Sequence, residues 1–330
     1  MPQSRGGKDI YYVRLAFVLK TVYIEGISME KLQLQIEEIS TRNGNQYQCI
    51  EMAIADSSGM ISPHILGEII LPPNLDLTRG VILWGAVPTW LAAHIVRCCS
   101  QAPWVGCFDI QSGSVVVAAS NSSELAAGDS FRFAPDKTPG NAVFIGGPPD
   151  SGKSVLSYAL ARSLKVTRQD KAIHLHRAQW DGEGNWFAEA SDRAFVEQLS
   201  QYYKAVWSER FFLYHANAIT NIREAVDLAL VDFGGKPKRR DVTLLNRCTH
   251  YIIISSKPEL IPEWHNFCAQ RGGLKPLAVI HSVLDERVEV VKTEPFLEIV
   301  AGPWVRGKTV KIPDQLLIEM LKLLPYSHFK

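Results

Sequence analysis

The residues best suited to chemistry form a glycine-rich loop near the middle of the chain. From Gly147 the sequence runs G-P-P-D-S-G-K-S, which fits the phosphate-binding pattern G-x-x-x-x-G-K-[ST]. In such a loop, backbone N–H groups and the positive end of the following helix dipole face the phosphates. We therefore predict a nucleotide site that includes these loop residues: Gly147, Asp150, Ser151, Gly152, Lys153 and Ser154.

Three side chains would carry the chemistry of this site. Lys153 would reach the β- and γ-phosphates, and the Ser154 hydroxyl would bind Mg²⁺. Asp232 ends an apolar run and has the form of the acid that helps to hold this Mg²⁺. Its alternative interpretation is a turn acid at the end of a strand. The predicted cofactors are thus ATP, or another nucleoside triphosphate, and Mg²⁺, with Ser154 and Asp232 as metal ligands.

Other polar residues of the second half have two interpretations each. Asp181 and Glu183 lie in a loop between two tryptophans, and we assign them to the nucleotide site, as a base or as partners of Mg²⁺. The basic run 236–240 is either a solvated face or a functional site, and the functional alternatives are a phosphate contact or an arginine finger into a neighbouring subunit. His174 and His176 would share one face of a strand, as a satisfied pair or as metal ligands without an identified third partner.

A largely parallel sheet would bring these residues together. The run 142–145 predicts a strand that enters the loop, and 155–161 has the apolar spacing of a helix that leaves it. Further strands are expected at 172–176, 228–232, 251–255 and 277–280, and helices at 193–208 and 313–324. Strands that alternate with helices predict a doubly wound parallel sheet, which binds its ligand at the carboxyl ends of the strands.

The first half of the chain predicts a small N-terminal α/β domain. Residues 10–24 are rich in strand formers, and Ser28 is a suitable N-cap for a helix over 29–39. Strands are expected at 49–54, 81–84, 104–109 and 114–119, and helices at 62–69 and 89–99. The stretch 134–140, with two prolines, predicts a boundary between an N-terminal domain, 1–133, and a P-loop domain, 134–330.

Composition limits the classes of function. The formal net charge of +1 argues against a strongly electrostatic nucleic-acid binder, and we expect no DNA partner. The apolar run 81–96 is too short to span a membrane and is interrupted by Gly85 and Pro88, so we expect no membrane contact. The chain starts without the apolar core of a signal peptide, and its six cysteines lack C-x-x-C spacing, which favours a cytoplasmic location.

Five short segments stand out between residues 80 and 133: G-V-I-L-W-G at 80–85, P-x-W-L at 88–91, W-V-G-C-F-D at 104–109, G-S-V-V-V-A-A-S at 113–120 and G-D at 128–129. Together they resemble segments of the CRISPR-associated Csx-three ring-nuclease family. A weaker match extends over 48–79. The second half is similar to the AAA- or kinase-like P-loop domain that some family members carry at their C-terminus.

The resemblance implies an activity for the first domain. Family members bind cyclic oligoadenylate, chiefly cyclic tetra-adenylate, between oligomerised subunits and cleave its phosphodiester bonds, with Mn²⁺ as an activator. This hydrolase activity switches off second-messenger signalling in type III CRISPR antiviral defence. The resemblance also implies RNA binding and a homo-oligomer, and we expect the P-loop domain to regulate assembly or turnover.

The family's site residues carry over unevenly. The family has a histidine after a helix, an aspartate nine residues later and an arginine two beyond it; here these positions are Ser100, Asp109 and Gln111. Only Asp109 matches, and Arg97 is a candidate cation for the phosphate. A histidine could act as a base and an arginine could stabilise a phosphorane, which serine and glutamine do poorly.

Three alternatives therefore stay open. Asp109 could be a turn acid at a strand end rather than a catalytic residue. The first domain could be a non-catalytic sensor of cyclic oligoadenylate. The chemistry could also lie only in the C-terminal half, as in a P-loop kinase or NTPase.

Overall fold

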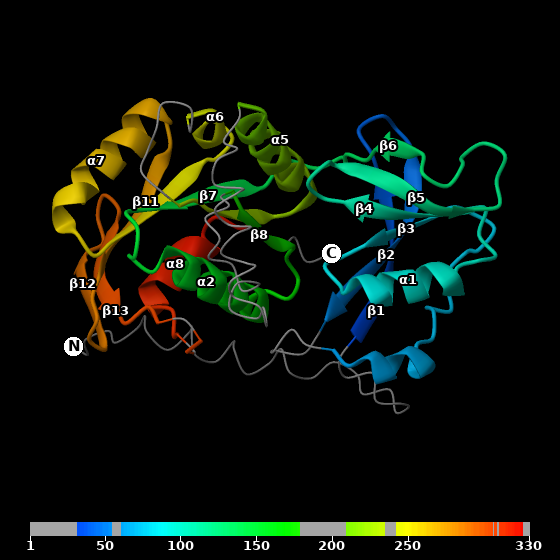
Figure 1. Cartoon of the computed structure of the whole chain (residues 1–330), viewed down its shortest axis with the longest axis horizontal. Helices are drawn as coiled ribbons and strands as arrows, with labels where there is room; N and C mark the ends of the chain where they lie inside the picture. The colour runs from blue at the N-terminus through cyan, green and yellow to red at the C-terminus, as the bar shows by residue number, and fades with distance from the viewer. Residues whose placement is uncertain are drawn as a thin grey trace, which may run out of the picture.

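The computed structural model describes residues 32–54, 61–178, 209–234, 242–305, 307–308 and 310–325. These residues form two β-sheets, one of six strands and one of seven, with helices packed on them (Figure 1). The mixed α/β fold with parallel strands that the sequence predicts is thereby confirmed.

The first sheet is mixed, with strand order β1-β2-β3-β4-β5-β6. Its strands are β1 (Leu32–Ser40), β2 (Gln46–Ile54), β3 (Val81–Trp84), β4 (Trp104–Asp109), β5 (Ser114–Ser120) and β6 (Ser130–Arg132). β2, β3 and β4 run parallel to one another, and the remaining neighbours are antiparallel. One face packs on helix α1 (Thr89–Cys98), whose Leu91 and Ile95 are fully buried, and on the 3₁₀ turn η1 (Pro63–Glu68).

Strand β1 corrects the helix expected over 29–39, of which residues 32–39 are described. Leu32, Leu34 and Ile36 alternate with polar residues, which is the period of a strand with one buried face. β1 pairs antiparallel with β2 along its whole length. The same apolar residues can be spaced onto a helix, but pairing with β2 satisfies the backbone and buries Leu32 in the core.

The second sheet has the strand order β12-β13-β11-β10-β7-β9-β8. Its strands are β7 (Asn141–Gly146), β8 (Ile173–Arg177), β9 (Leu228–Asp232), β10 (His250–Ser255), β11 (Lys275–Ser282), β12 (Arg287–Lys292) and β13 (Leu297–Gly302). All neighbours are parallel except β12 and β13, which are antiparallel. The carboxyl ends of six parallel strands therefore lie at one edge of this sheet.

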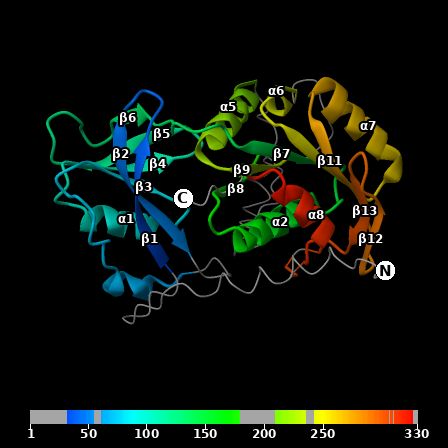
Figure 2. The same ribbon diagram turned by 180° about the vertical axis from the view of Figure 1, so that it is seen from behind.

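Helices cover both faces of the second sheet (Figures 1 and 2). One face carries α2 (Lys153–Thr167) and α8 (Asp314–Leu321). The other face carries α5 (Glu209–Ala225), α6 (Val242–Leu245) and α7 (Ile261–Asn266). The short helical turns η3 (Pro258–Leu260) and η4 (Phe267–Arg271) flank α7. Each face has its own buried apolar cluster. Strands with both faces buried explain the nearly continuous apolar runs in β7, β9 and β10.

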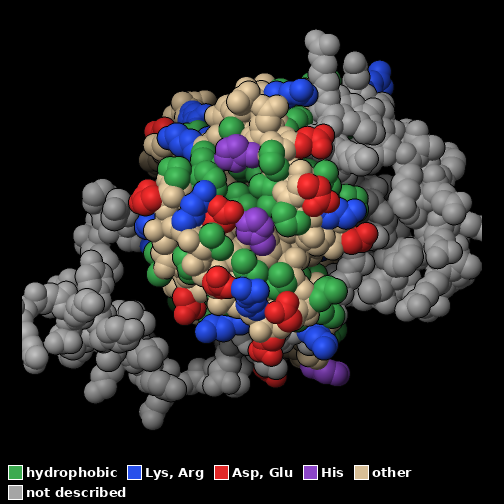
Figure 3. Space-filling view, turned by 90° about the vertical axis from the view of Figure 1, so that its left-hand side faces the viewer, with side chains coloured by type: hydrophobic (Ala, Val, Ile, Leu, Met, Phe, Trp, Pro, Cys, Tyr) green, Lys and Arg blue, Asp and Glu red, His purple; other side chains and the backbone are tan. Residues whose placement is uncertain are grey.

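Strand β12 is the edge of the second sheet and is exposed along its whole length. Val288 and Val290 lie open to solvent between charged side chains, among them Arg287 and Glu289, which form an ion pair. Figure 3 shows this end of the molecule as a mixture of hydrophobic side chains and both signs of charge. Charges along an edge strand oppose pairing with another chain.

Some expected elements cannot be compared with the structure. The strands expected at 10–24 and the helix expected at 193–208 lie outside the described residues. Helix α5 and the β12–β13 hairpin were not predicted from the sequence. In the part of the chain that the structure describes, no helix is both long and apolar enough to cross a membrane.

Candidate functional site

The glycine-rich loop connects the carboxyl end of β7 to the first turn of α2. Gly147 has φ +153°, and a Cβ atom there would overlap the carbonyl oxygen of Ile254 in β10. Gly152 has φ +86°, and a Cβ atom there would overlap Trp304 and lie 2.8 Å from its Cγ. Both positions therefore need glycine, because a side chain would be strained in this backbone conformation and would also collide with a neighbour.

The loop is anchored at the end of β10. The Ser151 side chain is buried, and its Oγ accepts a hydrogen bond from the backbone N–H of Ser256, with N and Oγ 3.2 Å apart. Lys153 is also buried, and its Nζ donates to the Pro148 carbonyl oxygen at 2.7 Å. Asp150 has φ +60° and is exposed. The loop is thus folded tightly around the Lys153 ammonium group, which supplies positive charge where phosphates are expected.

Asp232 lies beside this loop, at the end of β9. It pairs in register with Ile145, which comes directly before the glycines, and its side chain is only 7% exposed. The hydroxyl of half-buried Ser154 and the carboxylate of Asp232 are oxygen ligands of the kind that Mg²⁺ takes in nucleotide sites. The donor set fits a metal–nucleotide complex. Asp181, Glu183 and the basic run 236–240 lie outside the described residues.

Two histidines meet between β8 and α5. The Nε2 of His176 and the Nδ1 of His215 are 3.0 Å apart. Burial lowers the pKa of His176 to about 3 and that of His215 to about 4, so both are neutral at pH 7. Among the described residues, no group of three or more His, Cys, Asp or Glu could hold a metal ion. The pair is therefore a neutral hydrogen bond in the core between β8 and α5.

Asp109 stands at the end of β4 and closes a tight turn. Its carboxylate accepts hydrogen bonds from the backbone N–H groups of Gln111, at 3.1 Å, and Ser112, at 3.2 Å. Gly113 completes the turn with φ +65°, and its N–H donates to the Asp109 carbonyl oxygen. Asp109 is exposed, so it has a structural role in the turn and is still accessible to a ligand.

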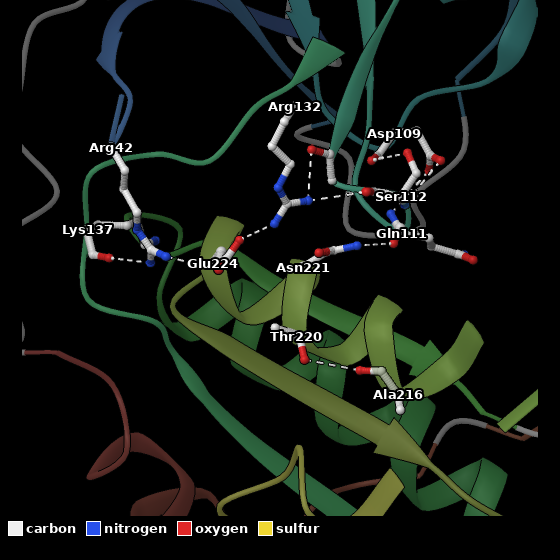
Figure 4. A network of polar contacts seen from close by, with 11 residues as sticks. Arg42, Asp109, Gln111, Ser112, Arg132, Lys137, Ala216, Thr220, Asn221 and Glu224 are labelled. Atoms are coloured by element: carbon white, nitrogen blue, oxygen red, sulfur yellow. Dashed lines mark hydrogen bonds and ion pairs between the residues drawn. The ribbon is translucent and has the colours of Figure 1, made fainter. Parts of the chain in front are cut away.

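The Asp109–Gly113 turn rests on helix α5 of the other half of the chain (Figure 4). Asn221 Nδ2 donates to the Gln111 carbonyl oxygen at 2.7 Å, and the Tyr214 hydroxyl donates to Gln111 Oε1 at 2.7 Å. Trp84 and Phe108 of the first sheet stack on each other and also pack against the apolar cluster that includes α5. Gln111 is thus held by the second half of the chain.

Two arginines of the first half converge on one carboxylate of α5. Arg132 forms an ion pair with Glu224 and donates to the carbonyl oxygens of Ser112 and Gly113, at 3.2 and 3.0 Å. Arg42 Nη1 lies 3.0 Å from Glu224 Oε1. These contacts were not predicted from the sequence, since residues 92 positions apart, such as Arg132 and Glu224, leave no local pattern.

The four candidate residues of the first half of the chain do not converge within one chain. Ser100 follows α1, and its carbonyl oxygen accepts a hydrogen bond from Asn121, which lies just beyond β5. Asn121 is next to the start of β4, whereas Asp109 and Gln111 are at its end. Six residues of strand separate these ends by about 16 Å. Ser100 and Arg97, both exposed, therefore lie apart from Asp109 and Gln111 within one chain.

Comparison with known proteins gives two kinds of similarity. Residues 54–132 match the model of a family described as CRISPR-associated protein (Cas_csx3). The septum site-determining protein MinD from Pyrococcus horikoshii OT3, complexed with Mg-ADP, has 12% identity and a TM-score of 0.32, over 43% of this chain and 70% of that chain. A plasmid partition protein from Borrelia burgdorferi B31, bound to AMPPNP, has 11% identity and a TM-score of 0.40, over 56% of this chain and 98% of that chain. Both TM-scores are low, so we base nucleotide binding on the loop geometry alone.

Proposed function

We propose that this is a CRISPR-associated ring nuclease whose first domain binds and cleaves cyclic tetra-adenylate and whose second domain binds a nucleoside triphosphate with Mg²⁺ and regulates the first. The match of residues 54–132 to the CRISPR-associated family model supports the first part. The matched region contains the exposed Asp109 and its turn. The positive-φ glycines on either side of the loop that holds buried Lys153, with Asp232 beside the loop, support the second part.

The proposed ligand lies between two subunits. Asp109 and Gln111 stand at one end of β4, and Arg97 and Ser100 at the other, so a site that uses both ends needs a second copy of the chain. A cyclic tetranucleotide carries repeated phosphates and can meet equivalent residues from symmetric subunits. In this arrangement Arg97 contacts phosphate, Asp109 acts at the scissile bond with Mn²⁺ as the activating ion, and the Gln111 amide donates to a phosphate oxygen.

Regulation by the second domain is supported by its contact with the Asp109–Gly113 turn. Helix α5 holds Gln111 through Tyr214 and Asn221. The same helix ends at Ala225, and β9 begins at Leu228 and carries Asp232 at its last position. Because α5 packs on β9 in the apolar core, a change at the nucleotide site that moves β9 would also move α5 and the turn that it holds.

The test is cleavage of cyclic tetra-adenylate by purified protein with Mn²⁺, with and without ATP, followed by chromatography of the products. Wild type should release linear adenylates, and Asp109→Asn, which keeps an acceptor for the turn, should not. Asp129→Asn is the matched control, since Asp129 is an exposed acid that caps a neighbouring turn by accepting from Ala126 N–H. Absence of linear products in wild type, or equal activity in Asp109→Asn, would contradict the nuclease proposal.

One observation favours a second candidate, a sensor that binds cyclic tetra-adenylate without cleaving it. The Asp109 carboxylate is already engaged by two backbone N–H groups, and neither Ser100 nor Gln111 is a strong base. Calorimetry would support the sensor if it shows tight binding while no metal produces cleavage.

A further inference from the structure

The polarity of a bound nucleotide can be derived from the order of the strands, if the second domain binds a nucleoside triphosphate as proposed. Asp232 at the end of β9 lies on one side of β7, and the ends of β10, β11 and β13 lie on the other side. The γ-phosphate and its Mg²⁺ belong near Lys153 and Asp232. The nucleoside must then extend away from Asp232, along the loop and toward the end of β13.

Trp304 lies on this path, between the phosphate loop and the end of β13. It follows β13 by two residues, and its side chain lies directly against Gly152, the last glycine of the loop. The indole N–H donates to the Ala301 carbonyl oxygen at 2.9 Å, which fixes the orientation of the ring. Trp304 is partly buried against the apolar cluster on the α2 side of the sheet and partly open to solvent. Val305, the next residue in the chain, is an apolar residue that is 38% exposed.

We propose that Trp304 is the stacking platform for the nucleobase of the bound nucleoside triphosphate. An aromatic ring held rigidly beside a phosphate loop offers a π-face to any base, and stacking strength rises with the size of the base. The glycine-rich loop itself contacts only phosphates and cannot distinguish bases. Trp304 therefore makes the site prefer nucleotides with a purine base over those with a pyrimidine, and over triphosphate without a base.

The test compares nucleotides with a ligand that lacks the base. Affinities of the full chain for ATP, CTP and inorganic tripolyphosphate, each with Mg²⁺, are measured by calorimetry for wild type, Trp304→Ala and Trp304→Phe. Trp304→Ala should weaken ATP binding about tenfold and leave tripolyphosphate binding within about twofold. Trp304→Phe should retain most of the ATP affinity because a ring remains. The preference for ATP over CTP should shrink in Trp304→Ala.

Several results would overturn this assignment. Equal losses of ATP and tripolyphosphate affinity in Trp304→Ala would mean that Trp304 only supports the loop through Gly152, and unchanged ATP affinity would mean that the base stacks elsewhere. Trp90→Ala, which removes a partly buried tryptophan from the first domain, controls for general destabilisation. Lys153→Ala should weaken both ligands, and a wild type that binds neither nucleotide nor tripolyphosphate would refute the proposed nucleotide site itself.

Discussion

Replacing Glu224 by alanine should loosen the contact between the two halves of the protein. The Glu224 side chain is 16% exposed and receives Arg132 and Arg42, whose side chains are 47% and 42% exposed. Ion pairs at exposed positions contribute about 0.2–1 kcal/mol each to stability. Because the Glu224 carboxylate is shielded from solvent, we expect each of its two ion pairs to contribute near the upper end of this range. We therefore expect Glu224→Ala to lower the free energy of unfolding by about 1–2 kcal/mol.

The assay is urea unfolding followed by circular dichroism, with a double-mutant cycle that combines Glu224→Ala and Arg132→Ala. The cycle isolates the energy of this pair from other effects of each substitution. Glu319→Ala is the matched control, because Glu319 is 20% exposed and pairs with Lys322 inside the single helix turn at the end of α8. Added salt should reduce the effect of Glu224→Ala, since the arginines are open to solvent.

A coupling energy indistinguishable from zero would refute this reasoning. So would a loss in Glu224→Ala no larger than that in Glu319→Ala. Either result would mean that the apolar contact of Trp84 and Phe108 and the hydrogen bonds of Gln111 hold the two halves together, with no net contribution from the ion pairs.

Three further predictions follow from single contacts. The free energy of unfolding should fall as the pH decreases from about 6.5 toward 4, because His176 and His215 have pKa values of about 3 and about 4 in the folded chain and about 6.5 when unfolded, so that the unfolded state binds more protons. The slope is at most about 1.4 kcal/mol per pH unit for each histidine. Urea titrations at several pH values should show a flatter slope for His215→Gln. If the first half of the chain cleaves cyclic tetra-adenylate as proposed, Tyr214→Phe should change the rate of cleavage severalfold and leave the ATP affinity measured by calorimetry unchanged, because it removes only the hydroxyl that holds the Gln111 side chain. A rate of cleavage identical to wild type would exclude Tyr214 as a positioning residue. Gly152→Ala should abolish nucleotide binding and lower the melting temperature, since the added Cβ overlaps Trp304 at a positive φ, and an intact melting temperature would contradict the packing described.

Local patterns in the sequence were enough to predict most of the second sheet. The apolar runs of β7, β9, β10 and β11 are bounded by turn residues, and each appears as a strand in the structure. Such runs can be recognised in the sequence because both faces of these strands are buried, so that nearly every residue is apolar. The prediction of a helix at β1 was wrong. Ser28 as an N-cap and the spacing of Ile36 and Ile39 suit a capped helix, but Leu32, Leu34 and Ile36 equally suit a strand with one buried face. Only pairing with β2 decides between them.

The candidate sites also differ in how far local sequence patterns predict them. The phosphate loop was found from its residue types alone, since eight consecutive residues carry the whole pattern. Asp109 was found through a resemblance, but the contacts of its turn with Tyr214 and Asn221 of α5 were not. The family pattern places Ser100 nine residues before Asp109 and Gln111 two residues after it, and strand β4 then separates Ser100 from the other two.

The sequence by itself determined the phosphate loop, its entering strand and its leaving helix, because backbone N–H groups, glycine torsions and a helix terminus are local features. Only the tertiary structure decided what surrounds the Asp109–Gly113 turn and the loop. Tyr214 reaches Gln111 from 103 residues away, and Trp304 reaches Gly152 from the end of β13. These contacts depend on how two sheets and their helices pack, and side-chain packing over such distances leaves no signal in the spacing of residues along the chain.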